Sequence, residues 1–388
     1  MRRPPTRRWW WLPVPRPASR GPVKSHLPTP RVLRPPGGRI RIPPPMARAP
    51  LEGPEQLFHF AEAAAPARVA PAFEPPSTVA EPIETVLITG IAGGQGRLIA
   101  RRVAGARCRI IGVDRVPWEG HPAEVRMHVL DIRKRKFEDV FRTERPDAVV
   151  HHAFVRHFRG DPEVRHEVNV LGTKRLLEYA IAHGVKRMVV LSSSYVYGAL
   201  PDNPYYVDEE FPLNVSRTYP EVRDLAEVDT LATAFLWRHP EVATAILRPV
   251  NTLGYYVQSA IGRYIRQRYV PTILGFNPMM QFIHEEDVAE AVALALQTGA
   301  HGVFNVAGPG AVPLKVAIGE TGGNAVPIPE TIARALFRGL FRFGLYHTPP
   351  GAMDFLKYPC TIDGRGFERA TGFKPLFSLE DIFASVRH

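Results

Sequence analysis

Cysteine is scarce in this chain of 388 residues, and long apolar runs are absent. Two cysteines, Cys108 and Cys360, cannot build a disulfide framework or a CxxC-type zinc site. No apolar run reaches the roughly 18 residues that a membrane-spanning helix needs. The segment Trp9–Leu12 is also too short for the apolar region of a signal peptide. We therefore expect a soluble, cytoplasmic protein without a metal site, and we do not expect the folded part to bind membranes.

Acidic residues are missing from the first 50 positions, which hold 12 Arg or Lys. The formal net charge of +11 belongs to this segment, because residues 51–388 hold 37 basic and 38 acidic side chains. A folded part with almost no net charge argues against nucleic-acid binding by that part.

Residues 1–82 contain 20 of the 40 prolines. Proline removes amide donors and like charges repel, so this stretch is predicted to be a disordered Pro/Arg-rich tail. It can be interpreted as an arm that binds nucleic acid or anionic lipid. The favoured interpretation is a linker, or an upstream start that is not used, in which case residues 1–45 are not translated and Met46 is the true start.

From residue 83 onward, short apolar runs alternate with longer amphipathic ones. Strands that are apolar at nearly every position suit a sheet covered on both faces, and their alternation with helices predicts parallel βαβ units. The fold class expected for residues 83–388 is a Rossmann-type doubly wound α/β sheet. A smaller substrate lobe is expected from residues 250–280 and 309–388. The predicted strands are 84–89, 108–114, 125–130, 148–153, 187–192 and 243–248, and the predicted helices include 96–104, 163–183, 221–237 and 285–297.

A glycine-rich turn follows the first predicted strand. Gly90 permits the turn, Gly93 lets the backbone approach a pyrophosphate, and Gly96 lets helix and strand pack closely. The second strand ends at Asp114, an acid placed to bind the adenosine ribose hydroxyls and to repel a 2′-phosphate. This favours NAD over NADP, although Arg115 lies next to it. Asp131 follows the third strand and could reach the adenine, or it could be a helix N-cap.

Hydroxyl groups cluster after the predicted strand 187–192, in Ser192–Tyr195. The carboxyl ends of parallel strands are where open α/β sheets bind ligands. Further along, Tyr219 and Arg223 are four residues apart, so they are predicted to share one helix face.

Together these motifs resemble the NAD-dependent epimerase/dehydratase family of extended short-chain dehydrogenases/reductases, to which UDP-galactose 4-epimerase belongs. The resemblance spans residues 83 to about 385 and is specific for the family rather than for a substrate. The motifs that carry it are Thr89–Gly96 (TGxxGxxG), His151–Phe154, Asn169–Thr173 (NVxGT), Ser192–Gly198 (SSxxVYG), Tyr219–Arg223 (at the YxxxK position), Arg248–Asn251 (RxxN), Phe282–Val288 and Thr371–Pro375.

The resemblance implies roles for individual residues. Tyr219 would be the general acid/base, Arg223 would take the place of the family's lysine, and Ser193 would bind the reacting oxygen. Asn251 would contact substrate, with a buried hydrogen-bonded asparagine as the alternative. Ala153, Asn169, Tyr219 and Arg223 would join Gly90, Gly93, Gly96, Asp114 and Asp131 in binding NAD. A homodimer through the helices after Glu163 and Glu221 is also implied.

Two positions depart from the family pattern. Arg223 keeps a positive charge, but its planar fork is bulkier than lysine. Met280 stands where UDP-sugar epimerases have an arginine that contacts the diphosphate. Arg263, Arg266 or Arg268 could replace that arginine, or could simply form a solvated helix face.

The function expected is an NAD-dependent epimerase/dehydratase that acts on a sugar-like alcohol. The family's default substrate is a nucleotide sugar. The alternative is a catalytically weakened dinucleotide-binding regulatory protein.

Three further features have ordinary structural interpretations. His151 and His152 lack converging metal ligands, and His284 is expected to pack as a structural residue. The arginine-bearing segment 330–345 is expected to dock on the small lobe, with a membrane-surface helix as the alternative.

Overall fold

The computed structural model describes residues 82–104, 108–155, 161–219, 222–257, 259–342 and 350–387. The predicted tail, Pro82 apart, and the alternative start at Met46 lie outside the described residues.

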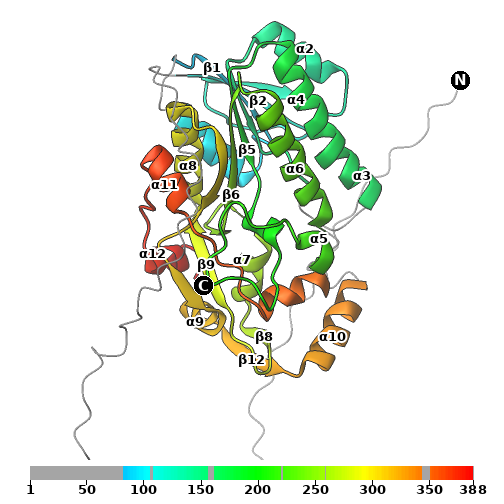
Figure 1. Ribbon diagram of the computed structural model, residues 1–388, viewed down its shortest axis with the longest axis vertical. Helices are drawn as coiled ribbons and strands as arrows, with labels where there is room; N and C mark the ends of the chain where they lie inside the picture. The colour runs from blue at the N-terminus through cyan, green and yellow to red at the C-terminus, as the bar shows by residue number, and fades with distance from the viewer. Residues whose placement is uncertain are drawn as a thin grey trace, which may run out of the picture. The chain divides into compact units, whose positions relative to one another are not determined.

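A seven-stranded parallel sheet forms the centre of the fold (Figure 1). Its strand order is β10-β6-β5-β4-β1-β2-β3, so the direction of winding reverses between β1 and β4. This confirms the predicted doubly wound Rossmann-type sheet. The six predicted strands start within one residue and end within two residues of the observed ones. The seven strands are β1 (Thr85–Thr89), β2 (Arg109–Asp114), β3 (Val125–Val129), β4 (Ala148–His151), β5 (Arg187–Leu191), β6 (Ala243–Pro249) and β10 (Gly302–Val306).

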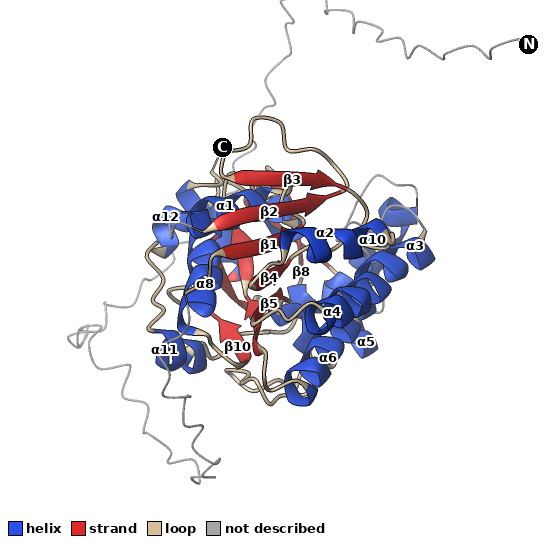
Figure 2. Cartoon of the chain, turned by 90° about the horizontal axis from the view of Figure 1, so that it is seen from above, coloured by secondary structure: helices blue, strands red, loops and turns tan. Residues whose placement is uncertain are grey.

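Helices cover both faces of this sheet, as Figure 2 shows. In β1, Val86 and Ile88 point to the face covered by α1, α8 and α11. Leu87 points to the face covered by α2, α4 and α6. Burial on both faces explains why the strands are apolar at consecutive positions. These helices are α1 (Gly94–Ala104), α2 (Lys136–Glu144), α4 (Gly172–Ala182), α6 (Arg223–Arg238), α8 (Glu285–Thr298) and α11 (Arg365–Thr371).

The segment predicted as one helix over 163–183 is divided. It consists of α3 (Pro162–His166), a π-helical turn η2 (Glu167–Leu171) and α4. The wide turn carries Asn169, which is buried. Single π-turns inside helices are frequent at functional sites.

A second group of elements lies beyond the carboxyl ends of the sheet. It has its own apolar core, which runs from Leu253 to Val386 in the sequence. This group includes much of the predicted substrate lobe, whose role stays a prediction. Its elements are β7 (Asn251–Leu253), α7 (Ala260–Ile265), β8 (Tyr269–Ile273), β9 (Met279–His284), β11 (Ala311–Pro313), α9 (Leu314–Glu320), β12 (Asn324–Ile328), α10 (Glu330–Arg342), η5 (Pro350–Leu356) and α12 (Leu379–Ala384). Two short helices, η3 (Ser194–Tyr197) and α5 (Val215–Thr218), follow β5.

Helix α10 packs on this second group through Ala333 and Phe337, which are buried. Arg334, Arg338 and Arg342 are exposed, as expected for a helix that docks on the lobe. The membrane-surface alternative is not tested by these contacts. None of the helices among the described residues is both long and apolar enough to span a bilayer.

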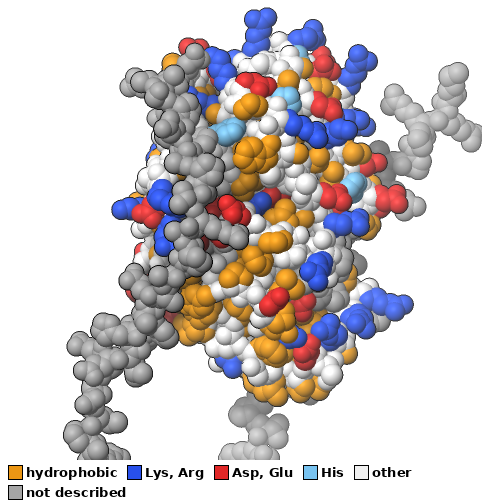
Figure 3. Space-filling view, in the orientation of Figure 1, with side chains coloured by type: hydrophobic (Ala, Val, Ile, Leu, Met, Phe, Trp, Pro, Cys, Tyr) orange, Lys and Arg blue, Asp and Glu red, His pale blue; other side chains and the backbone are white. Residues whose placement is uncertain are grey.

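Charged side chains of both signs are interspersed over the face shown in Figure 3. The visible face therefore has no continuous basic stripe of the kind that binds a nucleic-acid backbone.

Candidate functional site

The glycine-rich turn joins β1 to α1 at the carboxyl end of the sheet. Gly90 adopts φ +76°, and a Cβ there would lie 2.8 Å from the carbonyl oxygen of His152. A Cβ on Gly96 would lie 2.2 Å from the Gly90 carbonyl oxygen. Both positions therefore require glycine. At Gly93 the nearest such contact is 3.4 Å, which leaves room above the turn.

This turn fits the pyrophosphate of a dinucleotide. Helix α1 begins at Gly94, and a helix start carries unpaired N–H groups and a positive dipole end. Gly94 and Gln95 line the cavity described below. Gln95 is buried, and its Nε2 donates to the Glu285 carbonyl oxygen at 3.0 Å. Its Oε1 is buried and lacks a hydrogen-bond partner among the described residues, so a polar atom remains for a ligand to satisfy.

Asp114 lies at the end of β2, where its carboxylate organises the turn. It accepts hydrogen bonds from the backbone N–H groups of Ala92 at 3.0 Å and Val116 at 3.1 Å. The carboxylate is thus fixed beside the glycine turn, where the predicted ribose contact would be made.

Asp131, the predicted adenine contact, is engaged by a neighbour. Its carboxylate accepts from the Arg133 side chain at 2.7 Å and from the Arg133 backbone N–H at 2.9 Å. Burial would raise the pKa of Asp131, but these hydrogen bonds lower it below its ordinary value. Asp131 therefore stays ionised, with much of its acceptor capacity used inside the protein.

Hydrogen bonds connect the end of β4 with the end of β1, before the glycine-rich turn, and the residues after β4 with η2. Ala153 donates its N–H to Thr89 Oγ1 at 3.3 Å. The Asn169 side chain makes two hydrogen bonds with the backbone of Val155. Its Oδ1 accepts from the Val155 N–H at 2.8 Å, and its Nδ2 donates to the Val155 carbonyl oxygen at 3.2 Å. Asn169 lines the cavity described below, whereas Ala153 does not.

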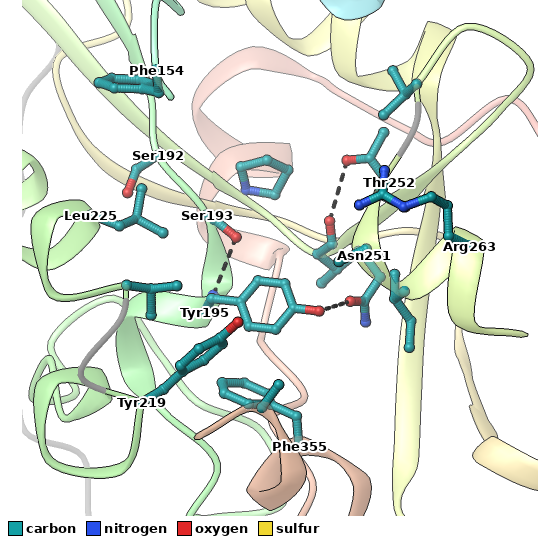
Figure 4. A pocket seen from close by; sticks show the side chains of 18 of the residues that line it. Phe154, Ser192, Ser193, Tyr195, Tyr219, Leu225, Asn251, Thr252, Arg263 and Phe355 are labelled. Atoms are coloured by element: carbon teal, nitrogen blue, oxygen red, sulfur yellow. Dashed lines mark hydrogen bonds between the residues drawn. The ribbon is translucent and has the colours of Figure 1, made fainter. Parts of the chain in front are cut away.

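A cavity of about 510 Å³ extends from this turn into the second group of elements. Gly94, Gln95 and Asn169 line one end, Ser193 and Tyr219 line the middle, and Met280 and Phe337 line the other end. Figure 4 shows Ser193, Tyr195 and Tyr219 around this space. Ser193 Oγ caps η3 by accepting the N–H of Tyr195 at 3.3 Å. The cavity thus connects the start of α1, next to the glycine turn, with two of the predicted catalytic residues, Ser193 and Tyr219.

Ser192 lines the cavity as well, whereas Ser194 is absent from its lining. Ser192 Oγ donates to Asp229 at 2.6 Å inside the core, and Ser194 is buried. This arrangement is consistent with the choice of Ser193 by register, although its role stays a prediction.

The predicted shared helix face of Tyr219 and Arg223 is wrong. Tyr219 follows α5 with φ −137° and ψ 72°, and α6 starts only at Arg223. The cause is in the sequence, because the residue before a proline avoids helical dihedrals and position 220 is proline. Tyr219 is buried and lines the cavity. Arg223 has a side chain that is 63% exposed, approaches Glu227 at 3.7 Å, and is absent from the cavity lining.

Arg165 was not singled out in the sequence, yet its side chain lines the cavity together with Tyr219. It is 13% exposed and donates to Asp224 Oδ2 at 3.1 Å. It comes from α3, about 50 residues before Tyr219 in the sequence, so no local motif connects the two.

The amide of Asn251 is hydrogen-bonded within the protein at both ends. Its Oδ1 accepts from the Tyr195 hydroxyl at 2.8 Å, and its Nδ2 donates to the Gln281 carbonyl oxygen at 2.9 Å. Burial raises the pKa of Tyr195 above its ordinary value, with a smaller contribution from Cys360. Tyr195 therefore stays protonated and serves as a donor. The buried hydrogen-bonded alternative for Asn251 fits these contacts, while its substrate contact stays a prediction.

Of the three arginines weighed as replacements at the Met280 position, Arg263 lines the cavity. Arg266 and Arg268 are absent from its lining. Met280 itself lines the cavity and is buried.

A loop from β7 covers the glycine turn. A Cβ on Gly94 would lie 2.2 Å from the Tyr256 carbonyl oxygen. The N–H groups of Tyr256 and Val257 donate to the Glu285 carboxylate at 3.0 and 2.7 Å. Glu285 thus fixes this loop over the start of α1.

Within the part of the chain that the structure describes, one histidine–carboxylate cluster has ligand atoms close enough for a metal: His166, Asp224 and Glu227, within 4.8 Å of one another. Its two carboxylates also face Arg165 and Arg223. Because these guanidinium groups already supply positive charge, the cluster does not by itself indicate a metal site.

His284 has a structural role, as expected. It caps α8 by accepting the Glu286 N–H at 3.3 Å, and its ring stacks on Phe377 with centroids 3.8 Å apart.

His151 is buried and hydrogen-bonded to the hydroxyls of Thr89 and Thr173, both at 2.8 Å. Burial lowers the pKa of His151 to about 3. Since the unfolded chain takes up this proton near pH 6.5, stability should fall as the pH drops from 6.5 toward 3, by up to about 1.4 kcal/mol per pH unit. Urea unfolding between pH 7 and pH 5 should give a steeper loss for the wild type than for His151→Gln. Equal slopes would contradict this assignment.

The chain matches the model of the NAD dependent epimerase/dehydratase family over residues 86–307. An uncharacterized protein of Mycobacterium tuberculosis is 30% identical over 316 residues, covering 77% of this chain and 82% of that protein. UDP-glucose 4-epimerase 2 of rice is 30% identical over 260 residues, covering 57% of this chain and 63% of the rice enzyme.

Solved structures share the fold. MoeE5 in complex with UDP-glucuronic acid and NAD has a TM-score of 0.62 at 23% identity, with 78% of this chain and 97% of that chain covered. UDP-glucose 4-epimerase of Thermus thermophilus in complex with NAD has a TM-score of 0.63 at 21% identity, with the same coverage.

Proposed function

Because the chain belongs to the NAD-dependent epimerase/dehydratase family, we propose that it uses NAD to oxidise a secondary alcohol of a sugar-like substrate. The observation that carries this proposal is the single cavity that runs from Gly94 and Gln95 to Ser193 and Tyr219. An epimerase would return the hydride to the other face of the ketone intermediate. A dehydratase would instead carry the ketone intermediate on to a different product. Relatives named as UDP-glucose 4-epimerases make nucleotide sugars the first substrates to test.

The fit of the glycine turn supports NAD as the cofactor. Gly90, Gly93 and Gly96 would hold the pyrophosphate at the start of α1, and Asp114 would accept from the ribose hydroxyls. Ala153 and Asn169 would shape the end of β4 beside it. When bound, NAD supplies a hydride acceptor.

Tyr219 would act as the general base on the substrate hydroxyl. As the C–H bond breaks, the hydroxyl proton must leave, and a phenolate oxygen can accept it. A free tyrosine has a pKa of about 10, so the phenolate needs a neighbouring cation at neutral pH. Ser193 would donate a hydrogen bond to the reacting oxygen.

Arg165 is better placed than Arg223 to be that cation, because its side chain is largely buried and lines the same cavity as Tyr219. Arg165→Gln should therefore lower kcat at least tenfold at pH 7 and move the rising limb of the pH profile to higher pH. Arg223→Gln is the matched variant and should change kcat less than threefold, since Arg223 is largely exposed. A larger loss of kcat in Arg223→Gln than in Arg165→Gln would contradict this assignment and support Arg223 as the cation that the family resemblance implies.

Mass spectrometry of the nucleotide released on denaturation tests the proposal. Stoichiometric NAD would support an enzyme that recycles its cofactor. The absence of NAD both in the purified protein and after titration with NAD would contradict the proposal.

The exposed position of Arg223 favours a second candidate, a dinucleotide-binding regulatory protein. Bound NAD without turnover of any nucleotide sugar, and without any change of phenotype in Tyr219→Phe, would support that candidate.

A homodimer through α4 and α6 stays a prediction. Trp237 on α6 is exposed, as a residue at such an interface would be in a single chain.

A further inference from the structure

The end of the cavity beyond the predicted catalytic groups is lined by carbon-rich side chains. They come from α7, β9, α10 and η5, which are separate in the sequence but meet in the second group of elements. All of them are at least nine-tenths buried. They are Ile261, Met280, Phe337, Met353, Phe355 and Leu356.

This apolar end is continuous with the reacting position. The ring of Phe355 lies 4.6 Å from that of Tyr195 and 6.2 Å from that of Tyr219, measured between centroids. Figure 4 shows Phe355 next to both tyrosines. A substrate whose hydroxyl reaches Tyr219 would therefore lay its remaining part against these side chains.

Two polar side chains of the lining, Tyr195 and Asn251, already have protein partners. The Tyr195 hydroxyl donates to Asn251, and the Asn251 amide donates to the Gln281 carbonyl oxygen. The Gln281 amide in turn is bonded to the backbone of Ile362, at 3.1 and 2.7 Å. A nucleotide base buried here would leave much of its hydrogen-bonding edge against carbon atoms, which is costly.

We infer that the sugar-like substrate carries a hydrocarbon chain, and that this chain occupies the apolar end of the cavity. The inference rests on the proposed function and changes only the group attached to the sugar. Burial of a hydrocarbon is favourable in proportion to its area, and it needs no polar partner. Arg263, at the edge of the same lining (Figure 4), suits an anionic link between sugar and chain.

The experiment uses the full chain and n-alkyl β-D-glucopyranosides from hexyl to nonyl, each below its micelle-forming concentration. Calorimetric titration should give affinities that rise about two- to fourfold with each added methylene, the range expected for a buried CH₂. UDP and dTDP, titrated separately, should bind more weakly than the nonyl glucoside. A flat dependence on chain length, or tighter binding of UDP, would overturn the inference.

Substitutions in the cavity lining test whether the hydrocarbon chain of the ligand binds in this cavity. Met353→Gln and Leu356→Gln should each weaken nonyl glucoside binding at least fivefold while NAD binding is retained. Leu376→Gln, an exposed position outside the lining, should change nothing. Equal losses in all three variants would show non-specific adsorption and would contradict the inference. Two substitutions at separate positions guard against a single misfolded variant.

Failure of the inference and failure of the proposed function are separable. A flat chain-length series combined with turnover of a nucleotide sugar would overturn the inference alone. A steep dependence of affinity on alkyl length, in a protein that neither binds NAD nor turns over any sugar, would overturn the proposed function alone.

Discussion

Tyr219→Phe is expected to lower kcat by a factor of about 10² to 10⁴, the usual contribution of a positioned acid/base group. The substitution removes one oxygen from a side chain that is buried in the cavity wall. KM should change by only a few fold, because the ring and its packing against Phe355 remain. Steady-state assays with the substrate that a nucleotide-sugar and alkyl-glycoside panel identifies will measure both constants.

Tyr205→Phe is the matched control, because Tyr205 is exposed and outside the cavity lining. It should keep wild-type kcat. A larger loss in Tyr195→Phe than in Tyr219→Phe would move the acid/base role to Tyr195 and contradict our assignment.

Asp229→Ala is expected to destabilise the fold by about 3–5 kcal/mol, because it leaves a buried guanidinium without its partner. Asp229 accepts from Arg248 at 2.5 and 2.9 Å, and both side chains are buried. Burial alone would lower the pKa of Arg248, but the hydrogen bonds and charge of Asp229 raise it above its ordinary value. Without Asp229 the guanidinium still stays charged, because arginine is not deprotonated in proteins, and it is then buried without its carboxylate. Urea unfolding will measure the change.

Asp139→Ala provides the contrast. Asp139 accepts from Arg142 at 2.8 Å on the surface, and the loss of such an exposed pair should cost less than about 1 kcal/mol. Equal effects of the two substitutions would refute the importance that we give to burial at Asp229.

The sheet could be predicted from the sequence because its strands are buried on both faces. Runs such as 86–88 and 188–191 are apolar throughout, and the glycine turn fixes where the first strand gives way to a helix. Ser193 could be chosen by its place in a motif, and the structure lines the cavity with it.

The site could be predicted less completely, for reasons specific to each residue. The four-residue spacing predicts a shared helix face for Tyr219 and Arg223, but the proline at position 220 disfavours helical dihedrals at Tyr219, and α6 begins only at Arg223. The engagement of Asp131 by Arg133 depends on side-chain rotamers that no pattern specifies. Arg165 reaches the cavity beside Asp224 of α6, which lies 59 residues further along the chain, and such a contact is a long-range property.

The cavity is assembled from segments that begin at Gly94 and end at Leu356. Its wall is therefore complete only after the chain has formed contacts between residues very distant in sequence, and such contacts close slowly because loop entropy opposes them. During refolding, secondary structure should return well before the ability to bind a ligand. Binding capacity then reports the last step of folding. A chain that emerges only as far as β10 would hold the glycine turn, Ser193 and Tyr219, yet lack the lining side chains of α10 and η5.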